Sequence, residues 1–200
     1  MRITDVDIWT VVVPVIPERV NSPEFGAPSW PKLPKHIIRL RTDRHVYGLG
    51  ETRRGCPREA AEAAAGALVG RDPLGIPLQD LPLVQSERPF HGSRASYEGL
   101  HGPGHSSPAY DAFEMAMFDL VGKALRVPAH TLLGGAVRDR ILVDYWIGQQ
   151  MPADAARNAR RGAERGFRGI KMKCAMDDPW EERLQAILDA AGPAFKVTID

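Results

Sequence analysis

Two lysines at alternate positions are the residues of this sequence whose types and spacing best suit catalysis. They lie in residues 169–174, where polar and apolar residues alternate as in a half-buried β-strand. Side chains of a strand alternate between its faces, so Lys171 and Lys173 share one face, with Cα atoms roughly 6 to 7 Å apart. Each ammonium group disfavours the charge of the other, so one lysine could act as a general base near pH 7. The pattern also fits an exposed edge strand with two solvated lysines.

An aspartate closes the next predicted strand, residues 194–200. The alternation places Asp200 on the same face as Lys196 and Thr198, at the carboxyl end of the strand. Mg²⁺ prefers oxygen ligands such as carboxylates, although a lone aspartate more simply caps a helix or pairs with a lysine. Combined with the two lysines, a magnesium-binding Asp200 suits removal of the proton α to a carboxylate, because the ion would stabilise the enediolate that forms.

The elements that must position these residues alternate between strand and helix after residue 140. Such alternation indicates βαβ units and a parallel sheet, and we expect the first strands of a TIM-type (β/α) barrel, whose active sites lie at the carboxyl ends of the strands. A complete barrel needs about 250 residues, so we expect it to be incomplete here and to continue in the natural protein. The predicted strands are 141–148, 169–174 and 194–200, and the predicted helices are 153–165 and 180–191, the second with Asp178 as N-cap, Pro179 at N1 and Gly192 after its end.

The first part of the chain predicts a separate α+β domain. Strand patterns in 36–41 and 47–52 are joined by a short polar turn, which indicates an antiparallel hairpin. Six prolines from Pro14 to Pro34, both included, favour a long irregular loop. The remaining predicted elements are a strand at 3–13, a helix at 60–69 that follows Pro57, and a helix at 108–126 with an Asp119–Lys123 pair on its solvated side.

Composition excludes several classes of protein. The 200 residues include 26 basic and 25 acidic side chains, and neither sign forms a long block, so we expect no nucleic-acid partner. No apolar stretch is long enough for a membrane span, and we expect a cytoplasmic protein without a membrane partner. Cys56 and Cys174 are too few for a disulfide framework and are expected to be free thiols.

Three segments carry a resemblance to a known family. Residues 109–123, followed by Pro128 and by Leu-Leu-Gly-Gly at 132–135, resemble the capping-domain signature of the mandelate racemase and muconate lactonizing family of the enolase superfamily. Gly-Leu-Gly-Glu at 48–51 resembles the family's segment after its second strand, and Lys-Met-Lys at 171–173 stands where the family has a Lys-x-Lys pair. Asp111 departs from the small residue usual at its position in the signature.

The resemblance implies a capping domain at 1–136 and the beginning of the barrel at 137–200. It implies that Lys173 is the base, that Lys171 polarises the substrate carboxylate and tunes Lys173, and that Asp200 is the first of three acidic Mg²⁺ ligands, the others lying beyond residue 200. The implied protein is a homo-oligomeric isomerase or lyase acting on a small-molecule carboxylate, as an acid-sugar dehydratase, a racemase or epimerase, or a cycloisomerase. The alternative is a non-catalytic paralogue or fragment that serves as an oligomerisation or binding module.

The family also closes a mobile loop of its capping domain over the substrate, which gives residues 14–34 a role. Candidate contacts in this loop are Asn21, Ser22, Phe25 and Trp30, although each could simply pack the loop against the protein. Trp146 is a further candidate for lining the pocket. Its alternation with Tyr145 leaves open which of the two faces inward.

Overall fold

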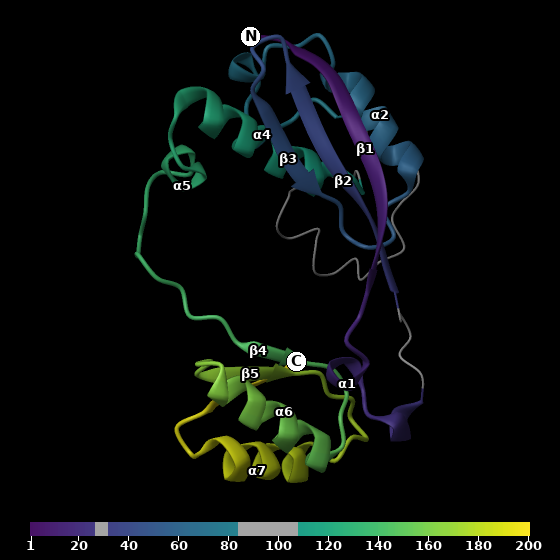
Figure 1. The fold of residues 1–200 in the computed structure, drawn as a ribbon, viewed down its shortest axis with the longest axis vertical. Helices are drawn as coiled ribbons and strands as arrows, with labels where there is room; N and C mark the ends of the chain where they lie inside the picture. Colours follow the sequence, from purple (N-terminus) through teal and green to yellow (C-terminus); the bar gives the residue numbers. More distant parts are fainter. Residues whose placement is uncertain (27–31, 84–107) are drawn as a thin grey trace. The chain divides into compact units, whose positions relative to one another are not determined.

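Two three-stranded sheets organise the chain, one containing an antiparallel hairpin and the other entirely parallel (Figure 1). The computed structural model describes residues 1–26, 32–83 and 108–200. The chain divides into unit 1, residues 1–13 and 33–137, and unit 2, residues 14–32 and 138–200. These units confirm the predicted fold class, an α+β domain and the beginning of a (β/α) barrel that is incomplete in this chain. The expected domain boundary between residues 136 and 137 stays a prediction.

Unit 1 is a sheet packed against helices, and its strand order is β1-β2-β3. The predicted hairpin is confirmed: β2 and β3 pair antiparallel, with Ile38 opposite Gly50 and Leu40 opposite Gly48. The elements are β1 (Ile3–Pro14), β2 (Lys32–Thr42), β3 (Tyr47–Glu51), α2 (Arg58–Leu68), the 3₁₀ turn η2 (Pro73–Gly75), α4 (Tyr110–Leu125) and α5 (Ala129–Leu132).

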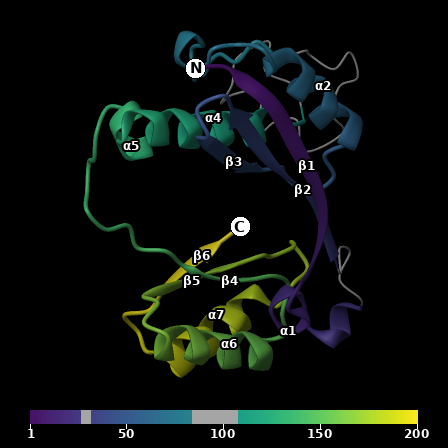
Figure 2. The same cartoon turned by 45° about the horizontal axis from the view of Figure 1, so that its top comes forward.

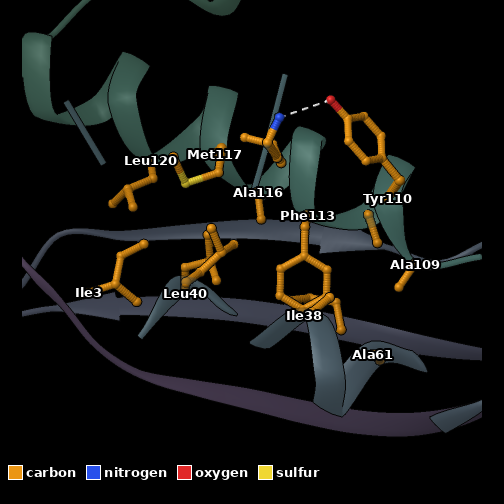
Figure 3. Packing of buried hydrophobic residues seen from close by; sticks show 14 of the residues in the cluster. Ile3, Ile38, Leu40, Ala61, Ala109, Tyr110, Phe113, Ala116, Met117 and Leu120 are labelled. Carbon is orange, nitrogen blue, oxygen red and sulfur yellow. Dashed lines mark hydrogen bonds between the residues drawn. The ribbon is translucent and has the colours of Figure 1, made fainter. Parts of the chain in front are cut away.

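The core of unit 1 lies between its sheet and its helices (Figure 3). The apolar stripe that 3.6-residue spacing predicts for the helix at 108–126 is buried from Ala112 to Val121, and Phe113 and Leu120 are fully inaccessible to solvent. Leu125, which the same spacing places on this stripe, is exposed, because it lies in the last turn of the helix. Tyr110, also buried, accepts a hydrogen bond at its hydroxyl oxygen from the backbone N–H of Leu81 (3.1 Å). Because the polar end of this ring is paired, the tyrosine can extend the apolar core without leaving a polar atom unsatisfied.

Glycines at positions 48 and 50 let helix α4 approach β3 closely. A Cβ atom added at Gly50 would lie 1.9 Å from the carbonyl oxygen of Ala112, and one at Gly48 would lie 2.0 Å from that of Ala116. Both distances are far below any real Cβ contact, so the two backbones can pack this closely only where the side chains are absent. The contact gives a physical reason for the alternate glycines of residues 48–51.

The solvated side of α4 is tied to the same strand. Asp119 accepts hydrogen bonds from the backbone N–H of Leu49 (2.8 Å) and from the ammonium group of Lys123 (2.6 Å). The second contact confirms the predicted i,i+4 pair. None of the described helices combines the length and apolar character that a membrane crossing requires.

Unit 2 contains the predicted βαβ units, with strand order β4-β5-β6. Both longer helices cover the same face of the sheet (Figure 2), where Ile147, Ile170, Met172 and Ile187 are fully buried. The predicted strand at 141–148 is shorter than expected, because residues 141–144 are exposed and outside the ladder. The elements are β4 (Tyr145–Ile147), α6 (Pro152–Glu164), β5 (Gly169–Met172), α7 (Trp180–Ala191) and β6 (Lys196–Ile199).

The predicted N-cap of α7 is wrong. Pro179 occupies the cap position, and no side chain caps the helix. Asp178 lies one residue earlier, where its carboxylate pairs with the guanidinium of Arg183 (3.1 Å). A buried guanidinium attracts a carboxylate more strongly than a helix N–H group does, which explains the difference. The predicted end is confirmed, because Gly192 follows the helix with a φ of 96°.

The predicted irregular loop at 14–34 is partly wrong. It contains a helical turn, α1 (Pro17–Val20), and a 3₁₀ turn, η1 (Pro23–Phe25), and β2 begins within it. Pro17 and Pro23 stand at the first positions of these turns, where the missing N–H is not needed and the fixed φ is favourable. Proline therefore begins structure here rather than preventing it.

Candidate active site

The register of the parallel strands sets which side chains share a face in unit 2. Trp146 aligns with Lys171, which aligns with Thr198, so their side chains point to the same side of the sheet. Tyr145 points to the opposite side, where it is buried against Phe167 with ring centroids 5.3 Å apart. Trp146, not Tyr145, therefore lies on the lysine-bearing face.

The two lysines and the aspartate come together at the carboxyl ends of β5 and β6. Lys171 Nζ lies 2.8 Å from Asp200 Oδ2, and Lys173 forms an ion pair with the same oxygen. Hydrogen bonds from the two ammonium groups lower the pKa of Asp200 to about 2. β5 is the central strand, so the edge-strand interpretation of the lysines does not hold, whereas pairing of Asp200 with lysine, the simpler interpretation of this residue, is what the structure contains.

Asp200 is chemically suited to bind Mg²⁺ as one ligand. Its carboxylate is half-exposed and supplies the oxygen donors that this ion prefers. Within residues 1–26, 32–83 and 108–200, no three His, Cys, Asp or Glu side chains gather as a metal site. The described residues thus fit one part of a magnesium site rather than a complete one.

A buried ion pair behind Lys173 was missed by the sequence analysis. Arg183 is fully buried and donates to the carbonyl oxygen of Lys173 (2.9 Å) as well as to Asp178. Burial alone would raise the pKa of Asp178, but hydrogen bonds from Ala175, Gln149 and Arg183 outweigh it, so the pKa lies below its ordinary value. A signal was present, because Arg183 is four residues before Ile187 and so falls on the buried stripe of its helix.

Residues 17–26, called segment 17–26 below, dock beside the carboxyl end of β4. The guanidinium of Arg19 lies over the ring of Tyr145, 4.1 Å from its centroid, and donates to the carbonyl oxygen of Trp146 (2.7 Å). The N–H of Gly148 donates in turn to the carbonyl oxygen of Arg19 (2.7 Å). A Cβ atom at Gly148 would lie 1.7 Å from the carbonyl oxygen of Val20, so this close contact requires glycine.

Ser22 links segment 17–26 to the first turn of α6. Its side chain is buried, its hydroxyl donates to the carboxylate of Asp154, and its oxygen accepts from the N–H of Met151 (2.8 Å). Met151 is the N-cap residue of α6, so Ser22 satisfies the backbone N–H of the cap residue from a distant part of the sequence, a contact that a side chain at N3 makes in a capping box. The hydrogen bond from Ser22 also lowers the pKa of Asp154.

The other predicted substrate contacts are placed as follows. Asn21 forms a parallel β-bridge with Gln149, and its amide group donates to the carbonyl oxygen of Gly26. Phe25 is half-buried in η1. Trp30 lies outside the described residues. Contact of any of these side chains with a substrate stays a prediction.

Sequence relatives of the chain are named as acid-sugar dehydratases. The sequence matches no protein-family model. A D-galactonate dehydratase of Verminephrobacter eiseniae is 32% identical over 140 residues, which cover 68% of this chain and 34% of that protein. A Streptomyces coelicolor protein named probable glucarate dehydratase is 31% identical over 231 residues, which cover 100% of this chain and 52% of that protein. The chain thus spans only about a third to a half of the length of these relatives.

Solved structures with the same fold cover the whole chain and 52% of their own chains. An isomerase from Streptomyces coelicolor has a TM-score of 0.66 and is 29% identical. A mandelate racemase/muconate lactonizing protein from Herpetosiphon aurantiacus has a TM-score of 0.73 at 22% identity. A dipeptide epimerase from Cytophaga hutchinsonii, complexed with Mg and a dipeptide, has a TM-score of 0.72 at 24% identity. The last two similarities concern the fold alone.

Proposed function

Because the chain belongs to the enolase superfamily, which includes mandelate racemase, we propose that its protein removes the proton α to the carboxylate of a small molecule. The observation that carries this proposal is the cluster of Lys171, Lys173 and Asp200 on one face of a parallel sheet, at the carboxyl ends of its strands. Barrel enzymes assemble their catalytic residues at this end.

Lys173 is the proposed base. In its amine form it takes the α-proton: the bond between Nζ and hydrogen forms as the bond between carbon and hydrogen breaks, and the electron pair moves into the carboxylate to give an enediolate. Lys171 donates a hydrogen bond to a carboxylate oxygen and so orients the α-carbon toward Lys173. Trp146, in register with Lys171, borders the substrate.

Asp200 is the proposed ligand of Mg²⁺ within this chain. When bound, the ion would supply the positive charge that stabilises the enediolate. The support is the half-exposed carboxylate at the strand end, together with a structure of the same fold that is complexed with Mg. Contacts with the side chains of Lys171 and Lys173 hold the carboxylate on the substrate face.

Dehydration of an acid sugar is the reaction we favour. The two sequence relatives described above, each more than 30% identical, are named as dehydratases of galactonate or glucarate, whereas the dipeptide epimerase is similar in fold only. After loss of the α-proton, the electron pair of the enediolate forms the carbon–carbon double bond as the bond between the neighbouring carbon and its hydroxyl oxygen breaks. The leaving oxygen takes a proton from the ammonium group of Lys173, which returns to its amine form, so water leaves and the resulting enol tautomerises to a 2-keto acid. The same membership leads us to propose a homo-oligomer that acts in the cytoplasm.

The test is exchange of the α-proton in D₂O, followed by proton NMR for D-galactonate and D-glucarate with Mg²⁺ present. We expect the α-proton signal to disappear and a 2-keto acid to form. The Lys173→Ala variant should lose at least about 10²-fold in rate, the lower end of what a positioned base contributes.

Lys196→Ala is the matched control. Lys196 aligns with Gly169, near the amino end of the strands, and its removal should leave the rate unchanged. Normal exchange by Lys173→Ala would refute the role of the lysine. A wild-type protein that exchanges neither these sugars nor other α-hydroxy acids would instead favour a non-catalytic binding or oligomerisation module.

A further inference from the structure

The ion pair of Asp178 and Arg183 is the most buried charged contact among the described salt bridges of the chain. The side chain of Arg183 is inaccessible to solvent, and that of Asp178 is 2% exposed. Removing two charges from water costs free energy that their mutual attraction seldom returns in full. Stability therefore does not by itself account for an ion pair at this place, and its contacts indicate another role.

These contacts converge on the backbone around Lys173. Arg183 Nη1 donates to the carbonyl oxygen of Lys173 (2.9 Å) and contacts Cys174 Sγ (3.2 Å), while Nη2 donates to Asp178 (3.1 Å). Asp178 accepts in turn from the N–H of Ala175 (3.0 Å). The planar guanidinium and the carboxylate together hold three consecutive residues.

The Asp178–Arg183 pair contacts the backbone immediately after the last residue of β5. The N–H of Lys173 still donates to the carbonyl oxygen of Ile147 in β4, and the N–H of Cys174 donates to the backbone carbonyl oxygen of Asp200. The carbonyl oxygen of Lys173 lies beyond β5 as the strand is assigned, and Arg183 is its hydrogen-bond donor. Both peptide groups of Lys173 are therefore fixed, one by the neighbouring strand and the other by the buried arginine.

The same pair reaches the strand end of β4. The amide of Gln149 donates to Asp178, and the carbonyl oxygen of Gln149 accepts from the N–H of Ser22. One buried carboxylate thus joins the ends of two parallel strands and, through Gln149, segment 17–26. A displacement of the pair would move all of these parts.

We propose that the buried Asp178–Arg183 pair is a positioning device that fixes the backbone at Lys173 and so aims its side chain at the α-carbon of the substrate. The inference rests on the proposed role of Lys173 as base. A lysine side chain is long and flexible, so the direction of its first bond sets the region that Nζ can reach. Misplacement of a reacting group by about 1 Å can reduce a rate about 10²-fold.

The main test is the double variant Asp178→Leu with Arg183→Met, made in the complete protein. It removes both charges together and leaves neither buried alone, so the fold should persist. We expect kcat for the same two acid sugars to fall by about 10- to 100-fold while KM changes little, because the substrate still binds but Lys173 is no longer oriented toward its α-carbon. Gln185→Met, an exposed change on the same helix, should leave both constants unchanged.

A second readout does not depend on activity. The N–H of Cys174 donates to Asp200, an acceptor that neither substitution touches, so its hydrogen exchange reports on the backbone itself. We expect this amide to exchange at least about tenfold faster in the double variant, with the amide of Met172 unchanged. If the wild-type protein proves inactive, the proposed function fails, and the exchange of Cys174 alone decides whether the pair fixes this backbone.

Two results would overturn the positioning role: an unchanged Cys174 exchange rate, or an unchanged kcat, whether or not KM rises. If the double variant does not fold, Arg183→Lys replaces it. Its ammonium group keeps the charge pair with Asp178 but lacks the fork that also reaches the carbonyl oxygen of Lys173. The same loss in kcat is expected there, and wild-type kcat in that variant would equally refute the inference.

Discussion

Substitution of Gly50 by alanine should unfold unit 1 at markedly lower denaturant concentration. The new Cβ atom would lie 1.9 Å from the carbonyl oxygen of Ala112 and must move to at least 3.0 Å, so helix α4 or strand β3 must retreat by about 1.1 Å. The three atoms nearest to this Cβ position are backbone atoms of Ala112 and Ala116, so no flexible side chain can move aside. The strain must therefore be relieved by moving a whole element.

The magnitude follows from what α4 buries. Phe113, Met117 and Leu120 are all fully buried on this helix, and a gap of 0.5 to 1 Å forfeits about a quarter to a half of a van der Waals contact. Overpacking typically costs about 1–3 kcal/mol and sometimes more. With an entire helix displaced, we expect the free energy of unfolding to fall by about 3 kcal/mol.

The assay is urea unfolding followed by far-ultraviolet circular dichroism. With a slope of about 2–3 kcal/mol per molar urea, the transition of unit 1 should shift by at least about 1 M. Gly66→Ala is the control, because a Cβ atom there meets nothing within 4 Å and lies in the exposed part of α2. That variant should be more stable than wild type by about 0.5–1 kcal/mol.

A Gly50→Ala protein as stable as wild type would show that α4 does not pack on β3 as described. A second check uses Gly48→Ala, whose clash is with Ala116, one helical turn from Ala112. One outward movement of the helix relieves both clashes, so the double variant should cost clearly less than the sum of the two single variants. Additive costs would indicate two independent local distortions instead.

Two further predictions concern Ser22 and the buried thiol. Ser22→Ala should lower the free energy of unfolding at pH 7 by about 1–2 kcal/mol, since the N–H of Met151 and the carboxylate of Asp154 lose their partner. The pKa of Asp154 is lowered, so its carboxylate stabilises the fold above the ordinary value near 4, and this contribution is lost as the pH falls through the folded pKa. The stability gap between variant and wild type in urea titrations should therefore be narrower below pH 4 than at pH 7, with the part due to the hydrogen bond to Met151 remaining; a constant gap would contradict this explanation. Burial raises the pKa of Cys56 to about 11, so at pH 8 only about one Cys56 thiol in a thousand is ionised. Ellman's reagent should therefore label Cys56 at least about 100-fold more slowly in the folded protein than in urea. Prompt labelling of Cys56 in the folded protein would refute its burial.

The fold was largely predictable because its patterns are local. Period-two alternation placed Lys171 and Lys173 on one face, and 3.6-residue spacing identified α4 and its buried stripe. Both follow from backbone geometry that each segment carries by itself. The boundaries of β4 and the cap of α7 were less accurate, because they depend on which neighbours compete for the terminal hydrogen bonds.

What the sequence determined by itself was the order of strands and helices, the shared face of the two lysines and the family resemblance of residues 109–123. Only the tertiary structure decided which distant groups meet: Ser22 with Asp154, and Arg183 with the carbonyl oxygen of Lys173. It also decided that Trp146, not Tyr145, shares the lysine face, because this depends on strand register. The physical reason is that side-chain direction along one element is fixed by backbone geometry, whereas the partner of a buried polar group is whichever donor or acceptor the packing brings within reach.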